Sequence, residues 1–347
     1  MTAVLPRPHL DHIRHSTRRA RTLCSHYSSV RADITRRHLF GLGAVTTAGV
    51  LAGCGTTDET GPGAGSELLD YDYLEFSGQI PADPQRVLVI EGRADLEFAL
   101  TCGYPVIASG FYFGRDGALF DELGELMPAD LETFDFAETN EPDYEKIASL
   151  EPDLIVMRQP AWAGDFYGRS RLLEIAPVLA VASGSTGWQQ TMRDQATLLR
   201  RDQVVNDEIE RYTDLIEEIR ARSGPQLDAT TLIYGTALDD GGMYVITDSQ
   251  ANEVAADLGI DVPRYEPGAD ENGYHELSPE NLDQVSEATT LAIYAYDERP
   301  ALGQTPTFQL LPAAQSGNVH SLDLTLNQGL ARAACAMARR LEEIVTA

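Results

Sequence analysis

The segment Arg86-Val-Leu-Val-Ile-Glu91 begins the part of the chain that decides the fold. Its four consecutive apolar residues predict a buried strand, and an apolar helical pattern follows over residues 94–102 and ends at Gly103. A second apolar strand is predicted at Val106-Ile-Ala108. A strand, a helix and a strand at this spacing predict a parallel βαβ unit.

The alternation of strands and helices continues along the chain. Further strands are predicted at residues 153–157, 178–181, 231–234, 243–246 and 291–296, and further helices at residues 252–258 and 328–345. Residues 187–222 have almost no strand signal, and apolar residues at steps of four and three predict one continuous helix that ends at Gly224-Pro225. These apolar residues are Val205, Ile209, Tyr212, Ile216 and Ile219.

We therefore expect an α/β fold of two Rossmann-like lobes with parallel-rich sheets, joined by one long α-helix. The expected division is an N-terminal lobe at residues 71–203, a linking helix at residues 204–222 and a C-terminal lobe at residues 223–347. A chain of 347 residues is long enough for two domains of ordinary size.

The N-terminal region has the layout of an export signal. Arg36 and Arg37 precede a short apolar run that ends in Leu51-Ala-Gly-Cys54, which is typical of a twin-arginine signal joined to a lipoprotein cleavage site. The apolar run is too short to span a membrane as a helix. We expect residues 1–53 to be removed, Cys54 to be lipidated at the outer face of the cytoplasmic membrane, and residues 54–70 to form a flexible tether.

The charge of the chain is strongly acidic, with 26 Lys and Arg residues against 54 Asp and Glu residues. Residues 1–53 contain eight Arg and two Asp, so the remaining chain has 18 basic and 52 acidic residues and a formal net charge of −34. A field of this sign repels nucleic acid and anionic lipid, so we expect no nucleic-acid partner and membrane contact through the lipid anchor only. Cys102 and Cys335 are expected to be buried reduced thiols rather than a disulfide.

Two similar segments occur once in each expected lobe. The first is Pro142-Asp-Tyr-Glu145-Lys-Ile-Ala-Ser-Leu150, and the second is Ser278-Pro-Glu280-Asn-Leu-Asp-Gln-Val285. In both, a Pro suited to the first helical turn precedes a short helix, and a Glu lies two residues before an apolar position. A predicted buried strand follows each segment, as a duplicated two-lobed protein would show.

On these segments the chain resembles the helical-backbone binding proteins of bacterial ABC importers, which carry ferric siderophores, haem or cobalamin. Glu145-Lys-Ile-Ala-Ser-Leu-Glu-Pro-Asp-Leu-Ile-Val156 is similar to the most recognisable segment of that family. The resemblance implies a monomeric extracytoplasmic receptor, not an enzyme, that needs no cofactor. It would capture a ferric siderophore between two lobes and deliver it to a permease dimer with its ATPase.

The resemblance also implies a docking role for Glu145 and Glu280, because the family has one Glu on each lobe that pairs with arginines of the permease. Two carboxylates on opposite lobes would orient the receptor over the transport channel. The alternative is that each Glu only favours the positive N-terminal end of its short helix.

A ferric siderophore is a bulky and often anionic chelate, so its cleft needs aromatic walls and a few arginines. In α/β folds the ligand-binding loops follow the strands. The candidate ligand-binding residues in such positions are Arg93, Tyr112, Arg115, Arg158, Trp162, Tyr244, Tyr274, Tyr296 and Arg299. Tyr274 matches a position where the family often has a cleft aromatic.

Other functions receive less support from the residues. A site for bare zinc or manganese needs several imidazoles and carboxylates, and only His275 and His320 follow residue 53, so no direct metal site is expected. A secreted lipoprotein enzyme is the less expected class, because the sequence has no Gly-x-Ser-x-Gly, zinc or phosphate-loop motif. Cobalamin and haem stay open as alternative ligands of the same fold.

Overall fold

The computed structural model describes residues 67–112, 114–137, 139, 141–183, 187–263, 274–327 and 329–347. The predicted signal and lipidation residues Arg36, Arg37 and Cys54 lie outside this range. Within the described ranges, no helix is both long enough and apolar enough to cross a membrane.

The first of two five-stranded sheets is entirely parallel, with the strand order β5-β4-β3-β6-β7. Its strands are β3 (Val87–Val89), β4 (Val106–Gly110), β5 (Glu132–Phe134), β6 (Leu154–Arg158) and β7 (Val178–Val181). The helices that connect them are α2 (Ala94–Thr101), α3 (Ala118–Leu123), η2 (Gly124–Leu126), α4 (Tyr144–Ser149), α5 (Gln159–Ala163) and α6 (Arg169–Ile175). Every residue of β3, β6 and β7 is buried, as expected for a parallel sheet covered on both faces.

The second sheet has the order β10-β9-β8-β11-β12, and β9 is antiparallel to both of its neighbours. Its strands are β8 (Leu232–Ala237), β9 (Met243–Ile246), β10 (Tyr274–Leu277), β11 (Thr290–Tyr294) and β12 (Val319–Leu322). The accompanying helices are α9 (Gln250–Asp257), η3 (Pro279–Val285), α10 (Ala301–Gln304), α11 (Pro306–Gln309), α12 (Pro312–Ser316) and η4 (Leu324–Leu326). The α/β class with two parallel-rich sheets is therefore confirmed.

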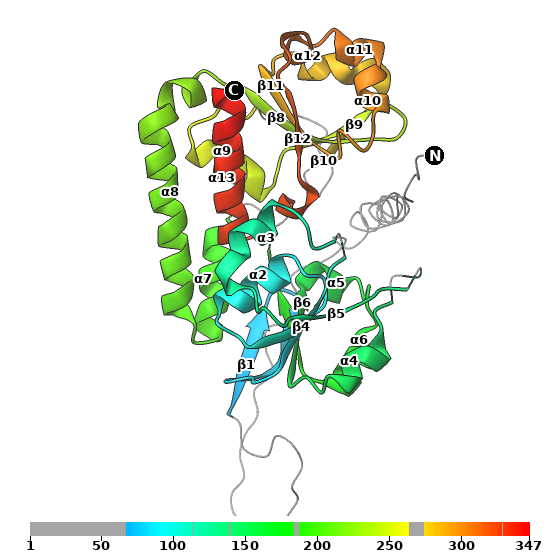
Figure 1. Ribbon diagram of the computed structural model, residues 1–347, viewed down its shortest axis with the longest axis vertical. Helices are drawn as coiled ribbons and strands as arrows, with labels where there is room; N and C mark the ends of the chain where they lie inside the picture. The colour runs from blue at the N-terminus through cyan, green and yellow to red at the C-terminus, as the bar shows by residue number, and fades with distance from the viewer. Residues whose placement is uncertain are drawn as a thin grey trace, which may run out of the picture.

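One long helix, α8 (Asp202–Asp228), follows α7 (Trp188–Leu198) and joins the two sheet regions. Figure 1 shows α8 along one side of the molecule, with the last helix α13 (Ala331–Thr346) beside it. The predicted end at Gly224-Pro225 is wrong, because α8 continues past Pro225. Burial of Leu227 and a hydrogen bond of 2.6 Å from the Ser223 hydroxyl to Glu342 of α13 hold this last turn in place, which offsets the cost of the proline.

The described part of the chain begins with a hairpin that lies outside the two five-stranded sheets. An antiparallel hairpin of β1 (Leu68–Tyr73) and β2 (Phe76–Pro81) precedes the first sheet, although the sequence predicted neither strand. It is a two-stranded sheet of its own.

Cys102 and Cys335 are both buried and free, so the prediction of reduced thiols is confirmed.

The N-terminus of α13 is capped by a residue from the first sheet region. Glu97 of α2 is fully buried, and its carboxylate accepts hydrogen bonds from the backbone N–H groups of Leu330 (2.8 Å), Arg332 (2.5 Å) and Ala333 (3.4 Å). The first N–H groups of a helix have no partner within the helix, so a carboxylate there satisfies them and interacts favourably with the helix dipole. The cap therefore fixes α13 against α2.

Candidate functional site

The two sheet regions approach each other where the strands β3, β4 and β12 end. The backbone N–H of Ala118, at the start of α3, donates to Asp323 Oδ2 at 2.7 Å, and Arg93 Nη2 donates to the carbonyl oxygen of Asn327. Gly117 makes the approach possible, because its φ is +143° and a Cβ there would lie 2.5 Å from Asp323 Oδ2. Carboxyl ends of parallel strands are where α/β proteins bind ligands, so we place the candidate site here.

A buried ion pair between Glu91 and Arg158 lies near Arg93 at the candidate site. Arg158 donates from Nε to Glu91 Oε2 and from Nη2 to Glu91 Oε1 at 2.9 Å, and the Tyr167 hydroxyl donates to the same Oε1 at 2.9 Å. Burial by itself raises the pKa of Glu91, but the charge and hydrogen bonds of Arg158 outweigh it and hold the pKa below its usual value. The contribution of Arg158 as a ligand contact stays a prediction; its guanidinium is already neutralised by Glu91.

Arg93 is the cation that reaches from the first sheet region to the second. It lies just before α2 and is 7% exposed, and its backbone N–H donates to Asp95 Oδ1 at 2.8 Å. Burial, followed by the nearby charge of Arg158, lowers the pKa of Arg93 to about 10. The guanidinium therefore stays charged at neutral pH, with the buried carboxylates of Glu91 and Asp95 near it.

Aromatic side chains of the first sheet region lie in the segments that follow β4 and β6. Tyr112 is buried and packs edge-on against Tyr167, with ring centroids 6.4 Å apart. Trp162 is half-buried, and Arg169 lies over its ring at 5.5 Å. The exposed Arg115 lies over the Phe111 ring at 5.4 Å.

The second sheet region contributes a cluster of tyrosines. Tyr244 on β9 and Tyr274 on β10 are half-buried and meet edge to face, with ring centroids 6.1 Å apart. Tyr294, at the end of β11, has its pKa raised by burial and by its proximity to Tyr274, while the charge of Arg93 acts in the opposite direction. Tyr294 therefore lies close enough to Arg93 and Tyr274 for both to act electrostatically on its hydroxyl.

Three members of this site were missed by the sequence predictions. They are Glu91, Tyr294 and Asp323. Tyr294 is the last residue of β11, and Tyr296 lies beyond the strand and packs against a different apolar cluster, so alternation along the predicted strand at residues 291–296 does not identify Tyr294. Glu91 and Asp323 carried no local signal, since their partners are 67 and 205 residues away in the sequence.

Tyr296 and Arg299 are grouped by the structure with the short helices α10 and α11. Tyr296 packs against Phe308 with ring centroids 5.9 Å apart and lines a pocket of about 320 Å³. Arg299 is 8% exposed and donates to the carbonyl oxygen of Ala237 at 2.5 Å, with Asp239 3.4 Å from its Nε. These contacts lie within the second sheet region, apart from the contacts of Arg93.

The two predicted docking residues are both exposed and both lie in the first turn of a short helix. Glu145 belongs to α4, which Asp143 caps by accepting from the N–H of Lys146 at 3.0 Å. Glu280 belongs to η3, which is a 3-10 helix and packs against α11. In Figure 1, α4 and α11 lie near opposite ends of the molecule and away from α8. Within the described residues, neither Glu takes part in an ion pair.

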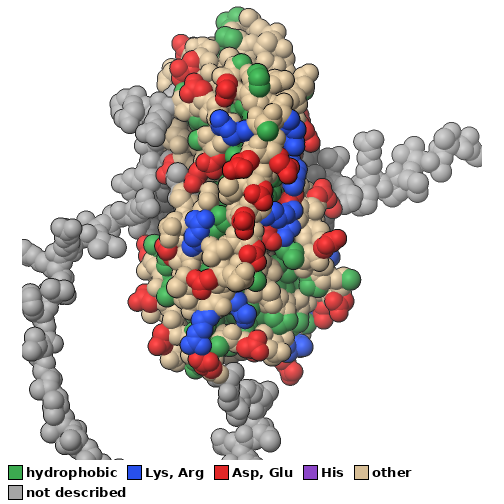
Figure 2. Space-filling view, turned by 90° about the vertical axis from the view of Figure 1, so that its left-hand side faces the viewer, with side chains coloured by type: hydrophobic (Ala, Val, Ile, Leu, Met, Phe, Trp, Pro, Cys, Tyr) green, Lys and Arg blue, Asp and Glu red, His purple; other side chains and the backbone are tan. Residues whose placement is uncertain are grey.

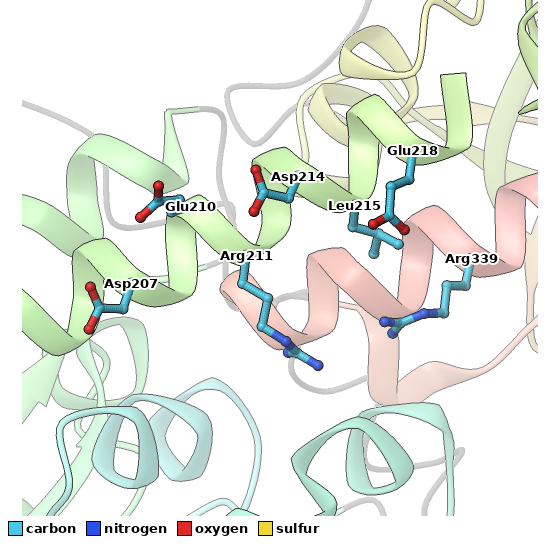
Figure 3. Close-up of a pocket in the computed structure, with 7 residues that line it drawn as sticks. All are labelled: Asp207, Glu210, Arg211, Asp214, Leu215, Glu218 and Arg339. Carbon is cyan, nitrogen blue, oxygen red and sulfur yellow. The ribbon is translucent and has the colours of Figure 1, made fainter. Parts of the chain in front are cut away.

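The pocket in Figure 3 lies between α8 and α13 and has a volume of about 440 Å³. Arg211 and Arg339 extend toward one another there, and both bind Glu122 of α3, Arg211 at 2.9 Å. The remaining lining residues include four carboxylates of α8, namely Asp207, Glu210, Asp214 and Glu218. Figure 2 views this side of the molecule and shows Asp and Glu side chains interspersed with Arg and Lys. Such a surface does not suit an anionic ligand.

Within the described ranges, no group of three or more His, Cys, Asp or Glu side chains is placed to hold a metal ion. A site that takes iron as a preformed chelate does not need such a group, because the chelator supplies the ligands.

Comparisons with known proteins identify the family. A family model described as "Periplasmic binding protein" matches residues 125–325. The Fe(3+) dicitrate-binding periplasmic protein FecB of Escherichia coli (strain K12) is 28% identical over 247 residues, which cover 69% of this chain and 77% of that protein. The Fe(3+)-citrate-binding protein YfmC of Bacillus subtilis (strain 168) is 21% identical over 283 residues, which cover 79% of this chain and 85% of that protein.

Among solved structures, the chain is similar to a periplasmic binding protein component of a Fep/Fec-like ferrichrome ABC transporter from Bacillus subtilis. The TM-score is 0.60 at 16% sequence identity, and the match covers 77% of this chain and 96% of the other. At this identity the likeness establishes the fold.

Proposed function

Because the chain belongs to the periplasmic binding protein family, we propose that it is an extracytoplasmic receptor for a ferric chelate, either ferric citrate or a ferric siderophore. The observation that carries the proposal is the buried but charged Arg93 between the two sheet regions, with Tyr274 and Tyr294 beside it. A cation in a poorly solvated setting among aromatic rings fits a bulky anionic chelate. The ferric citrate specificity in the names of two relatives supports the same class of ligand over cobalamin or haem.

The same proposal includes the route and the partners of the receptor. The twin arginines Arg36 and Arg37 would direct export of the folded chain, and Cys54 would carry the lipid anchor. The tether would be the residues between Cys54 and β1, because the predicted tether at residues 54–70 overlaps β1, which begins at Leu68 and pairs with β2. The lobes at residues 71–203 and 223–347, joined by the linking helix, would act as a monomer. They would deliver the chelate to an ABC permease dimer with its ATPase, as a binding protein without catalytic activity.

A fluorescence titration tests ligand capture. The chain has two tryptophans, and Trp188 is fully buried against Tyr212, whereas Trp162 is half-buried near the candidate site. We expect saturable quenching by ferric dicitrate or by a ferric hydroxamate or catecholate at submicromolar concentration. The quenching should be lost in Trp162→Phe, where Trp188 serves as an internal reference. Quenching by haem or cobalamin alone would contradict the iron chelate assignment.

A double variant tests docking. Glu145→Ala with Glu280→Ala should reduce uptake of the chelate by cells at least tenfold, because both lobes lose the carboxylate that pairs with a permease cation. Binding of the chelate by the purified protein should be unchanged. The matched control is Glu210→Ala with Glu217→Ala, two exposed glutamates of α8. Weaker chelate binding in the docking variant would show that docking is not the sole role of the pair.

A further inference from the structure

Five large apolar side chains are conspicuously exposed in the described part of the protein. They are Leu68, Leu74, Leu173, Val204 and Leu310. Leu68 and Leu74 belong to the β1–β2 hairpin, and Val204 lies in the first turn of α8. Leu173 is 53% exposed and lies on α6, and Leu310 is 70% exposed and directly follows α11. They are different, because α6 and α11 each pack against the element with a predicted docking Glu.

In the first sheet region, α4 and α6 form one unit. Ile147 of α4 and Leu172 of α6 are fully buried in the same apolar cluster. The Tyr144 hydroxyl donates to the carbonyl oxygen of Tyr167 at 3.1 Å, just before α6. On the outside of this unit, Glu145 lies two residues before the buried Ile147, and the exposed Leu173 follows the buried Leu172.

The second sheet region repeats this arrangement with η3 and α11. Leu282 of η3 and Phe308 of α11 are buried in one apolar cluster, and the Thr307 hydroxyl donates to the carbonyl oxygen of Pro279. Glu280 lies two residues before the buried Leu282, and the exposed Leu310 lies two residues after the buried Phe308.

The chain order matches as well. In each half the Glu helix is followed by the strand next to the edge, β6 or β11, and then by two short helices, of which the second carries or ends at the leucine. The edge strand, β7 or β12, comes last, and in the second half one more helix, α12, precedes it. A carboxylate and an exposed leucine thus occur together once per half, at corresponding places in the topology. The hairpin leucines and Val204 have no such counterpart.

We propose that Leu173 and Leu310 are apolar anchors of the same docking surface as Glu145 and Glu280. The surface fits a partner made of two like halves, each presenting a basic side chain beside an apolar depression, and the partner is the permease dimer. This inference rests on the proposed function. A leucine that becomes buried in a contact strengthens binding by the transfer of its apolar area from water, which the carboxylate alone cannot supply.

Site-specific photocrosslinking in cells that express the full chain tests the proposal. A benzophenone amino acid is placed at position 173 or 310, and at the hairpin positions 68 and 74 as controls of similar exposure. Positions 148 and 283, exposed and three residues after each Glu, report on docking itself. We expect 173 and 310 to crosslink to the same ABC permease polypeptide, identified by mass spectrometry, and 68 and 74 not to do so.

The outcomes separate the inference from the proposed function. Crosslinks to the permease from 148 and 283 but not from 173 or 310 would overturn the anchors and leave docking intact. Permease crosslinks from 68 and 74 as strong as those from 173 and 310 would also overturn them. If all six positions fail to reach a permease while the protein still binds ferric dicitrate, both the anchors and the docking role fall, but ligand capture stands.

A substitution measures the size of the effect. In a Leu173→Asn, Leu310→Asn background, the crosslinking yield at position 148 should fall about tenfold or more, given the affinity that a buried leucine contributes. The matched background Leu68→Asn, Leu74→Asn should leave the yield unchanged. Both double variants should bind ferric dicitrate like the unmodified protein, and equal yields in the two backgrounds would refute the anchors.

Discussion

Replacing Arg158 with methionine should lower the free energy of unfolding by about 3–5 kcal/mol. The methionine fills much of the volume of the arginine stem, so the loss comes from Glu91, which is fully buried and keeps only Tyr167 as a side-chain hydrogen-bond donor among its described partners. An unpaired carboxylate in such a place is costly, and it regains stability only by taking up a proton. Denaturant unfolding of the purified lobes at pH 7 measures the change.

The control for this prediction removes both charges. Glu91→Leu with Arg158→Met should be less destabilising than Arg158→Met alone, because the carboxylate that loses its guanidinium partner is removed as well, while the nearby Arg93 keeps the buried Asp95 close to it. The pH dependence gives a second check. The pKa of Glu91 is held below its usual value of 4.5, so the stability that the ion pair supplies is present above that pH and is lost as the pH falls further. The difference between Arg158→Met and the unmodified protein should therefore shrink as the pH falls. The unpaired Glu91 of the variant takes up its proton first, and the ion pair of the unmodified protein is lost only below about pH 4.5. A difference independent of pH would contradict the ion-pair explanation.

Replacing Glu97 with alanine should cost about 2–3 kcal/mol, because three backbone N–H groups at the start of α13 lose their acceptor. Glu97→Gln keeps one acceptor oxygen and should cost about 1 kcal/mol. The exposed Glu210→Ala on α8 is the matched control and should change the stability by less than about 0.5 kcal/mol. Hydrogen exchange should show faster exchange of the amides of Leu330, Arg332 and Ala333 in Glu97→Ala.

Glu97 also predicts a pH dependence of the opposite sign to that of Glu91. Burial raises the pKa of Glu97 from the usual 4.5 to about 7, against the backbone hydrogen bonds, which lower it. A carboxyl whose pKa is raised on folding favours the folded state most at low pH, so this contribution is lost as the pH rises from about 4.5 through 7. Glu97→Gln should remove that slope, and an unchanged slope in this variant would assign it to another group.

Local patterns in the sequence were sufficient for the elements whose burial is regular. The apolar run before Glu91 and the strand at residues 153–157 are predicted within a few residues of β3 and β6, because a strand covered on both faces needs only consecutive apolar side chains. The apolar steps from Val205 to Ile219 likewise predict α8. The β1–β2 hairpin was missed, since its turn residues Leu74 and Glu75 include no Gly or Asn and β2 contains Gly78 and ends in Pro81, although buried and exposed residues alternate along β1.

The candidate site was only partly predictable, for a physical reason that Arg158 illustrates. It was expected in the loop after the strand, but it is the last residue of β6, and nothing nearby in the sequence indicates that Glu91 would neutralise it. Arg93, by contrast, lies where the prediction placed it and reaches Asn327 across the two sheet regions. Whether a guanidinium pairs with a carboxylate of the protein or can contact a ligand depends on which side chains the fold brings within hydrogen-bond distance of it.

The sequence by itself determined the class of the fold, the repeated Glu segments and the acidic character of the chain, because these depend on residue type and on spacing within one turn or one strand. Contacts between distant segments are needed to show that Glu97 caps a helix 233 residues away, that α8 passes through Pro225, and that α6 packs against α4 and α11 against η3. Only the tertiary structure decides these features, because the energies of such contacts enter only after the chain has packed.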